Sequence, residues 1–139
     1  MRDEVIKRIK NIGYDVSSKD YPLIEMEIER VQCYICQSIG VDCVPKVLKG
    51  ILIDRAAGGF LFIKKRIDSD FSIAACDNGA LKELKEGDVS VIYDTSTCQS
   101  KGSYEDLLIQ KLMTCGNDEI IAHRAIVWWK ERIYWLKMI

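Results

Sequence analysis

Cysteine is the residue type that most invites a chemical interpretation in this chain of 139 residues, which contains six cysteines. Cys33 and Cys36 form a C-x-x-C motif. In thiol oxidoreductases this motif follows a strand and begins a helix, whose dipole lowers the thiol pKa. Here the motif falls in the middle of a predicted helix with no strand before it, so we expect packing and not redox chemistry. A thiol enzyme built on these two residues remains an alternative.

Metal binding and acid–base catalysis find equally little support in the pattern of side chains. A zinc site needs more ligands at metal-like spacing, and His123, the single histidine, lies far along the chain from the C-x-x-C motif. Glu83, Glu86 and Asp88 cluster in sequence, but carboxylates on a charged segment are more often solvated than catalytic. We therefore predict that the protein is not an enzyme and has no catalytic residue, no metal and no cofactor.

The composition is that of an ordinary globular domain. Charged residues make up 29% of the chain and hydrophobic residues 48%, and the formal net charge is -1. That balance gives no overall attraction to nucleic acid. The charged start and the lack of a long apolar run predict neither a signal peptide nor a membrane span. We expect a protein made and kept inside a cell, with six reduced cysteines in or near the core: Cys33, Cys36, Cys43, Cys76, Cys98 and Cys115.

Hydrophobic periodicity predicts a mainly α fold. Helices are expected over residues 2–12, from Asp20 to the stop at Gly40, from Pro45 onward, briefly over residues 80–86, and from Ser103 as N-cap to Gly116. Residues 89–93 alternate and predict a short strand. The predicted core consists of apolar residues at helical spacing: Ile24, Ile28, Val31, Ile35, Val47, Leu48, Ile51, Leu52, Leu108 and Leu112.

Two short motifs in the third helix region allow both a structural and an interaction role. Gly58 and Gly59 cost a helix up to about 2 kcal/mol together, so another backbone is expected to pass close by. That neighbour is a second helix of the same chain or another copy. Lys64, Lys65 and Arg66 follow as a basic triplet, either a solvated helix end or a surface close to DNA.

The C-terminal region is aromatic and basic, and its period is ambiguous. From residue 119 onward the hydrophobic residues fit a strand as well as a helix. Aromatic content slightly favours a strand or extended arm. Trp128, Trp129 and Trp135 supply more apolar area than a solvated tail needs.

In order and spacing these elements resemble the head–tail connector (head completion, or adaptor) proteins of tailed phages and prophages. The resemblance rests on three segments, namely residues 54–62, Lys-Glu-Gly-Asp-Val-Ser-Val at 85–91, and Arg-Ala-Ile-Val-Trp at 124–128. It covers residues 1–128, expected as a single helical connector domain. Residues 129–139 extend past the usual finish of the family and are expected to form a separate aromatic and basic arm.

The resemblance implies a small helical bundle with a short strand or β-hairpin projection, to which we add the expected C-terminal arm. It also implies a virion-assembly role: a homo-oligomeric ring of about twelve subunits below the portal protein, followed by a further connector or the tail. DNA passes through without specific binding. The location is the host cytoplasm during assembly and the head–tail junction afterwards. No membrane is involved.

We expect the subunit contacts to use the paired glycines, the strand and the tail: Gly58, Gly59, Val89, Val91, Tyr93, Trp128, Trp129 and Trp135. A short strand without a partner would invite pairing with another segment. The main rival is a small helical nucleic-acid-binding or regulatory protein, in which tryptophans beside Lys130 and Arg132 would stack on single-stranded bases. That protein would also use the basic triplet.

Overall fold

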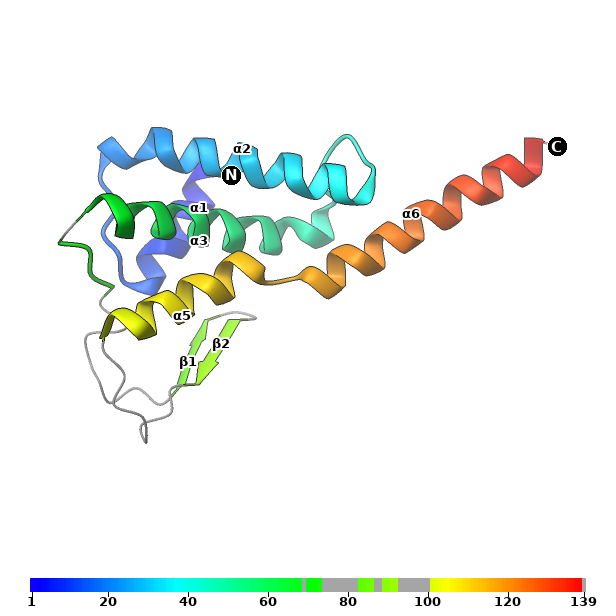
Figure 1. Ribbon diagram of the computed structural model, residues 1–139. Helices are drawn as coiled ribbons and strands as arrows, with labels where there is room; N and C mark the ends of the chain where they lie inside the picture. Colours follow the sequence, from blue (N-terminus) through cyan, green and yellow to red (C-terminus); the bar gives the residue numbers. More distant parts are fainter. Residues whose placement is uncertain (69, 74–82, 87–88, 93–100, 139) are drawn as a thin grey trace.

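The computed structural model describes residues 1–68, 70–73, 83–86, 89–92 and 101–138, and it is mainly helical (Figure 1). The helices are α1 (Arg2–Ile12), α2 (Tyr21–Ile39), α3 (Lys49–Ile67), α5 (Lys101–Thr114) and α6 (Asn117–Met138), with single 3₁₀ turns at Ser18–Asp20 and Lys46–Leu48. None of the helices in these ranges is long and apolar enough to cross a membrane.

Helices α1, α2, α3 and α5 pack into a bundle, here called the body, with α3 at its centre. Helix α3 packs against α1, α2 and α5, and Figure 1 shows α2 and α5 along opposite sides of it. The predicted stripe of α2 is confirmed, because Ile24, Ile28, Val31 and Ile35 are all buried. The remaining core comes from the other helices and includes Val5, Ile9, Leu52, Phe60, Leu61, Leu108 and Leu112.

The predicted core is wrong at Val47, and Ile51 is less buried than predicted. Val47 is 75% exposed, because it lies in the 3₁₀ turn before α3 and not on the buried face of that helix. Leu48 in the same turn is buried, whereas Ile51 is half-buried. A tighter turn rotates successive side chains by a different angle from an α-helix, so an α-helical period misplaces one of them.

Two short strands pair in the second half of the chain. Strand β1 (Glu83–Glu86) runs antiparallel to β2 (Val89–Ile92), with Glu83 opposite Ile92 and Glu86 opposite Val89. The helix predicted over residues 80–86 is therefore wrong for residues 83–86, where pairing with β2 replaces local helical hydrogen bonds. Residues 80–82 and Tyr93 lie outside the described ranges.

The C-terminal region is helical throughout its described part, so the expected strand or extended arm is wrong. Ile120 and Val127 lie seven residues apart on one helical face. Ile120 is buried and Val127 half-buried where α6 packs against α2. This packing decides the ambiguity that composition left open. Beyond Val127 the helix continues away from the body (Figure 1). The boundary expected at residues 128 and 129 therefore falls inside a continuous helix.

Candidate interaction surface

The outer half of α6, residues 128–138, is apolar and exposed. Trp128, Trp129 and Trp135 are 65%, 71% and 70% exposed. Four further large hydrophobic residues of this segment are exposed as well: Ile133, Tyr134, Leu136 and Met138. So many exposed large hydrophobic side chains in one short segment are typical of an interaction site, since single proteins rarely leave large apolar areas uncovered.

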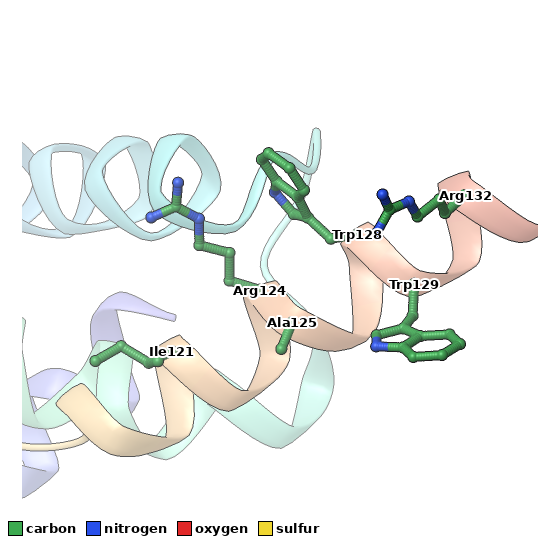
Figure 2. A pocket seen from close by; sticks show the side chains of 6 residues that line it. All are labelled: Ile121, Arg124, Ala125, Trp128, Trp129 and Arg132. Atoms are coloured by element: carbon green, nitrogen blue, oxygen red, sulfur yellow. The ribbon is translucent and has the colours of Figure 1, made fainter.

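A groove runs along the inner part of this surface. It has a volume of about 470 Å³, and it is lined by Ile121, Arg124, Ala125, Trp128, Trp129 and Arg132. Figure 2 shows Arg124 and Trp128 on the same side of the helix, with Trp129 pointing away on the other. The Arg124 guanidinium lies 6.0 Å from the Trp128 ring centroid, at the outer range of a cation–π contact. Indole faces beside two guanidinium groups can hold an apolar segment that carries acidic groups.

The direction of α6 is set by a buried arginine that the sequence analysis missed. Arg55 of α3 donates from Nε to the Cys115 carbonyl at 2.8 Å and from a terminal nitrogen to Asn117 Oδ1 at 2.5 Å. Its guanidinium also lies 5.3 Å from the centroid of the Tyr34 ring. Because Cys115 directly follows α5 and Asn117 begins α6, one side chain holds the turn between the two helices. A lone arginine in the apolar run of α3 was the available signal.

Gly116 completes this junction. Its φ of 74° is in the left-handed region, where glycine is favoured. A Cβ at this position would come within 2.5 Å of the Ile51 side chain. The turn between α5 and α6 is thus held against α3 on two sides, by Arg55 and by Ile51. The predicted end of α5 at this glycine is confirmed, whereas Ser103 lies inside α5 and not at its N-cap.

Gly58 and Gly59 are buried inside the body and are not at an interface with another copy. A Cβ on Gly58 would lie 2.8 Å from the Leu112 Cβ and 3.0 Å from the Met113 amide nitrogen of α5. A Cβ on Gly59 would clash with the Glu27 carboxylate, which is buried in α2. The expected intersubunit contact at these glycines is therefore wrong. The intramolecular alternative is correct, because α3 uses both glycines to approach its own neighbours.

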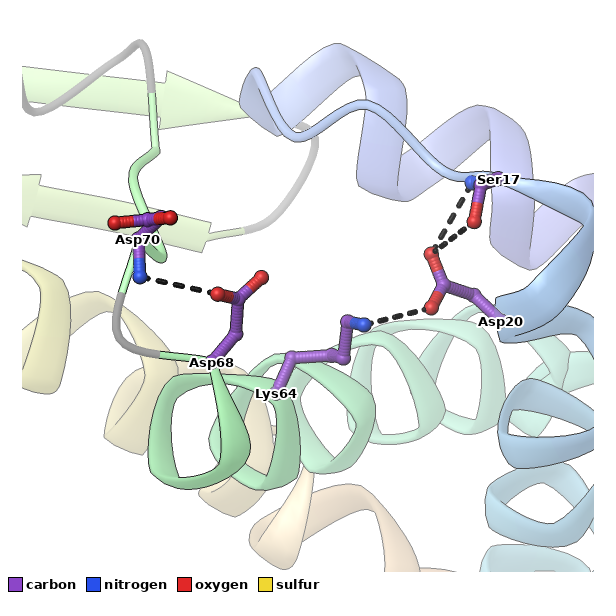
Figure 3. A network of polar contacts seen from close by, with 5 residues as sticks. All are labelled: Ser17, Asp20, Lys64, Asp68 and Asp70. Atoms are coloured by element: carbon purple, nitrogen blue, oxygen red, sulfur yellow. Dashed lines mark hydrogen bonds and ion pairs between the residues drawn. The ribbon is translucent and has the colours of Figure 1, made fainter.

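The basic triplet does not form a free cationic surface. Lys64 Nζ lies 2.9 Å from Asp20, an ion pair that Figure 3 shows bridging α3 and the start of α2. Lys65 Nζ lies 2.8 Å from Asp106 of α5. The Arg66 guanidinium stacks 4.4 Å from the centroid of the Phe62 ring. Two of the three charges are paired within the body, so the triplet offers less free positive charge than its sequence suggests. A location close to DNA stays a prediction.

The strand residues expected at an interface belong to the β1–β2 pair. Val89 lies opposite Glu86 and Val91 opposite Leu84. The argument that β2 lacks a strand partner is therefore wrong, since β1 pairs with one of its edges. Tyr93 lies outside the described residues.

The described cysteines are less buried than predicted. Cys33 and Cys43 are exposed, and Cys36 and Cys115 are half-buried. Burial raises the pKa of Cys36, and it raises the pKa of Cys115 to about 11. Higher pKa values keep these thiols protonated, whereas a nucleophilic cysteine needs a lowered pKa. Cys76 and Cys98 lie outside the described ranges.

The other candidate groups are dispersed. His123 is half-buried on α6, whereas Glu83 and Glu86 lie at the two ends of β1. Asp88 is outside the described residues. Among the residues that the structure describes, no three histidine, cysteine or acidic side chains converge as a metal site would require.

Comparison with known proteins adds no relative. No family model matches the chain, and no curated protein or solved structure is similar enough to count as a match.

Proposed function

We propose that this protein is a structural subunit of a phage or prophage virion, a head–tail connector that assembles into a ring between the portal and the tail. The observation that carries the proposal is the outer half of α6. This segment holds three exposed tryptophans outside the body and has no partner among the described residues. Aromatic anchors of this kind dominate interface energies, so the helix is built for contact with another protein.

The rest of the molecule supports a structural role. Its body is a rigid bundle, in which α3 is held to α2 and α5 by buried glycines and by ion pairs. In the proposed connector, the β1–β2 pair would serve as the projection and the outer half of α6 as the arm. In the ring, the near-neutral chain lets DNA slide through the channel without sticking. The partners are then other copies of the chain, the portal protein, and the next connector or the tail.

One observation favours a second candidate function. The groove on α6 places Trp128 on the same side of the helix as Arg124, 6.0 Å from its guanidinium, which suits stacking on a single-stranded base. The basic triplet does not add to this surface, because Lys64 and Lys65 are paired within the body. The nucleic-acid alternative therefore depends on α6 alone, and it predicts binding that weakens steeply with salt.

The decisive experiment mixes purified protein with portal-bearing heads and images the vertex by electron microscopy. The intact chain is expected to add a ring below the portal. A chain truncated after Trp128 is expected to stay folded, by circular dichroism, but to add no ring. Val47→Ser is the matched control, because Val47 is equally exposed but lies on the body.

Normal rings from the truncated chain would contradict the proposal. Failure of the intact chain to bind heads, together with salt-dependent binding of a single-stranded oligonucleotide, would support the nucleic-acid function instead.

A further inference from the structure

Helix α6 carries an apolar stripe, three of whose five members lie in its outer half, with the spacing of a helix–helix contact. Its members are spaced alternately by four and three residues: Ala122, Ile126, Trp129, Ile133 and Leu136. At 100° per residue they occupy one face of α6, and that face lies well away from the face of Ile120 and Val127, which turns toward the body. All five side chains are exposed. This spacing is that of the a and d positions of a coiled coil.

The residues that flank this stripe are basic. Lys130, Arg132 and Lys137 fall at the e and g positions beside the apolar residues. Two copies of α6 packed together would bring these cations against one another, in a parallel or in an antiparallel pair. Like charges at such positions destabilise the pairing, so the stripe calls for a partner surface that is apolar and acidic.

The opposite end of the molecule offers such a surface. A groove of about 500 Å³ lies against the first half of α2, where Met1 and Met26 supply exposed apolar side chains and Glu25 and Glu29 supply exposed carboxylates. Arg2 also lines this groove, and its guanidinium lies 2.9 Å from Glu25, so the groove is acidic chiefly at Glu29. Exposed methionines make adaptable contacts with aromatic rings, which suits a tryptophan-bearing helix.

We propose that the outer half of α6 of one copy docks in the Met26 groove of the next copy, so that tryptophan meets methionine and the basic flanks meet Glu25 and Glu29. Figure 1 shows that α2 begins at the end of the body opposite to the one from which α6 projects. A contact between two different surfaces at opposite ends is heterologous, and it repeats from copy to copy until the chain of subunits closes into a ring or continues as a filament. The inference rests on the proposed function only in taking a second copy as the partner.

Charge reversal on each surface tests this pairing in the absence of portal. The tail variant is Lys130→Glu with Arg132→Glu, and the groove variant is Glu25→Lys with Glu29→Lys. Sedimentation velocity at low salt is expected to show concentration-dependent association of the intact chain. Each variant alone is expected to lose about tenfold in association constant or more, since its tail and groove then carry the same charge.

An equal mixture of the two variants is expected to regain association, because every tail then finds a groove of opposite sign. The chain that carries all four changes is expected to associate by itself for the same reason. All the substituted side chains are exposed, so circular dichroism should show unchanged folding.

Three results would overturn the proposal. The first is an intact chain that stays monomeric at all concentrations. The second is a groove variant that associates like the intact chain, which would indicate pairing of α6 with α6. The third is binding of the tail to vesicles of anionic phospholipid without any association of copies, which would assign the surface to a membrane. None of these measurements involves portal, so the connector function is judged separately by the head-completion experiment.

Discussion

The body of this protein and the outer half of α6 are both helical and both rich in large hydrophobic residues, but they use those residues in opposite ways. In the body Ile35 is completely buried at the contact of α2 with its neighbours. In α6 the same residue type at Ile133 is 44% exposed, and Trp135 is 70% exposed. The body therefore satisfies its apolar surface within one chain, whereas the outer half of α6 requires something else to cover it.

The charged side chains of the body and of α6 differ in a similar way. Charged groups on the body are paired across helices, as in the contact of Arg8 Nε with Asp54 at 2.7 Å and that of Lys64 with Asp20. On α6 the cations Lys130, Arg132 and Lys137 are exposed beside apolar side chains. Internal pairing makes a rigid object, and unmatched apolar and basic surface makes a docking element. In the described residues, the features that stabilise the body and the apolar surface left exposed therefore lie on different helices.

The largest expected effect tests how tightly the body is packed. Gly58→Leu would force a side chain into the space of the Leu112 side chain and the Met113 backbone, and we expect a loss of at least about 3 kcal/mol or complete unfolding. Gly50→Leu in the same helix is the control, because nothing lies within 4 Å of its would-be Cβ and leucine is the better helix former. Urea titration followed by circular dichroism compares the two. Equal stability of both variants would refute the close contact of α3 with α5.

The second prediction compares one residue type in the two regions. Ile35→Ala is expected to reduce the free energy of unfolding by about 2–5 kcal/mol, because it leaves a cavity in the core. Ile133→Ala is expected to change it by less than about 0.5 kcal/mol in the monomer. Thermal and urea unfolding at low protein concentration measure both. A large loss at Ile133 would mean that the outer half of α6 folds back onto the body.

The sequence predicted the fold correctly where the hydrophobic residues follow a single, helical period. The stripe of α2 from Ile24 to Ile35 fits a helix and nothing else, so its burial followed directly. In α6 the stripe of Ile126, Trp129, Ile133 and Leu136 lies among further hydrophobic residues such as Trp128 and Trp135, so the sequence fits a strand as well as a helix. Packing of Ile120 against the body favours the helix. Sequence composition predicted the tryptophans as interface residues, which stays a prediction, without identifying the helix that carries them.

Contacts between distant segments were not predictable from the chain alone. The glycine pair predicted that another backbone passes close to α3. The sequence does not determine whether that neighbour contains Leu112 of the same chain or belongs to another copy. The ion pairs of Lys64 and Lys65 join residues far apart in sequence, so the triplet resembled a free basic patch. Arg55 went unnoticed for the same reason, because its partners Cys115 and Asn117 lie 60 and 62 residues further along the chain.

A smaller effect concerns the pH dependence of the body. Burial tends to raise the pKa of Asp20, but hydrogen bonds from Lys64 and Ser17 outweigh it, and the pKa lies below its ordinary value of 3.8. A carboxyl with a lowered pKa contributes stability above about pH 4 that is lost as pH falls through the folded-state pKa. The Lys64 pKa is raised above 10.5, chiefly by Asp20, so the same pair keeps its contribution until pH rises beyond that value.

Asp20→Asn should therefore cost about 1.5 kcal/mol at pH 7, because a charged hydrogen-bond acceptor for Lys64 is lost. The variant should also show a weaker decline in stability below pH 4 than the intact chain. Asp15→Asn, at an exposed neighbouring position, is the control and should change neither quantity. Urea unfolding at several pH values measures both effects. An identical acid profile for Asp20→Asn and the intact chain would show that the ion pair adds nothing.

The smallest expected effect on stability comes from the largest change to the chain. Removing residues 129–139 deletes two tryptophans, but every side chain described in that segment is exposed. Little apolar surface returns to water when such residues are lost, so the hydrophobic contribution to folding is nearly unchanged. We expect the free energy of unfolding to shift by less than about 0.5 kcal/mol at a concentration where the intact chain is monomeric. At higher concentration the intact chain should gain apparent stability with concentration and the truncated chain should not, because association stabilises only the folded state that binds. Thermal unfolding across a dilution series measures this divergence. A truncated chain that unfolds at markedly lower temperature at every concentration would show that the outer half of α6 supports its own body and is not reserved for a partner.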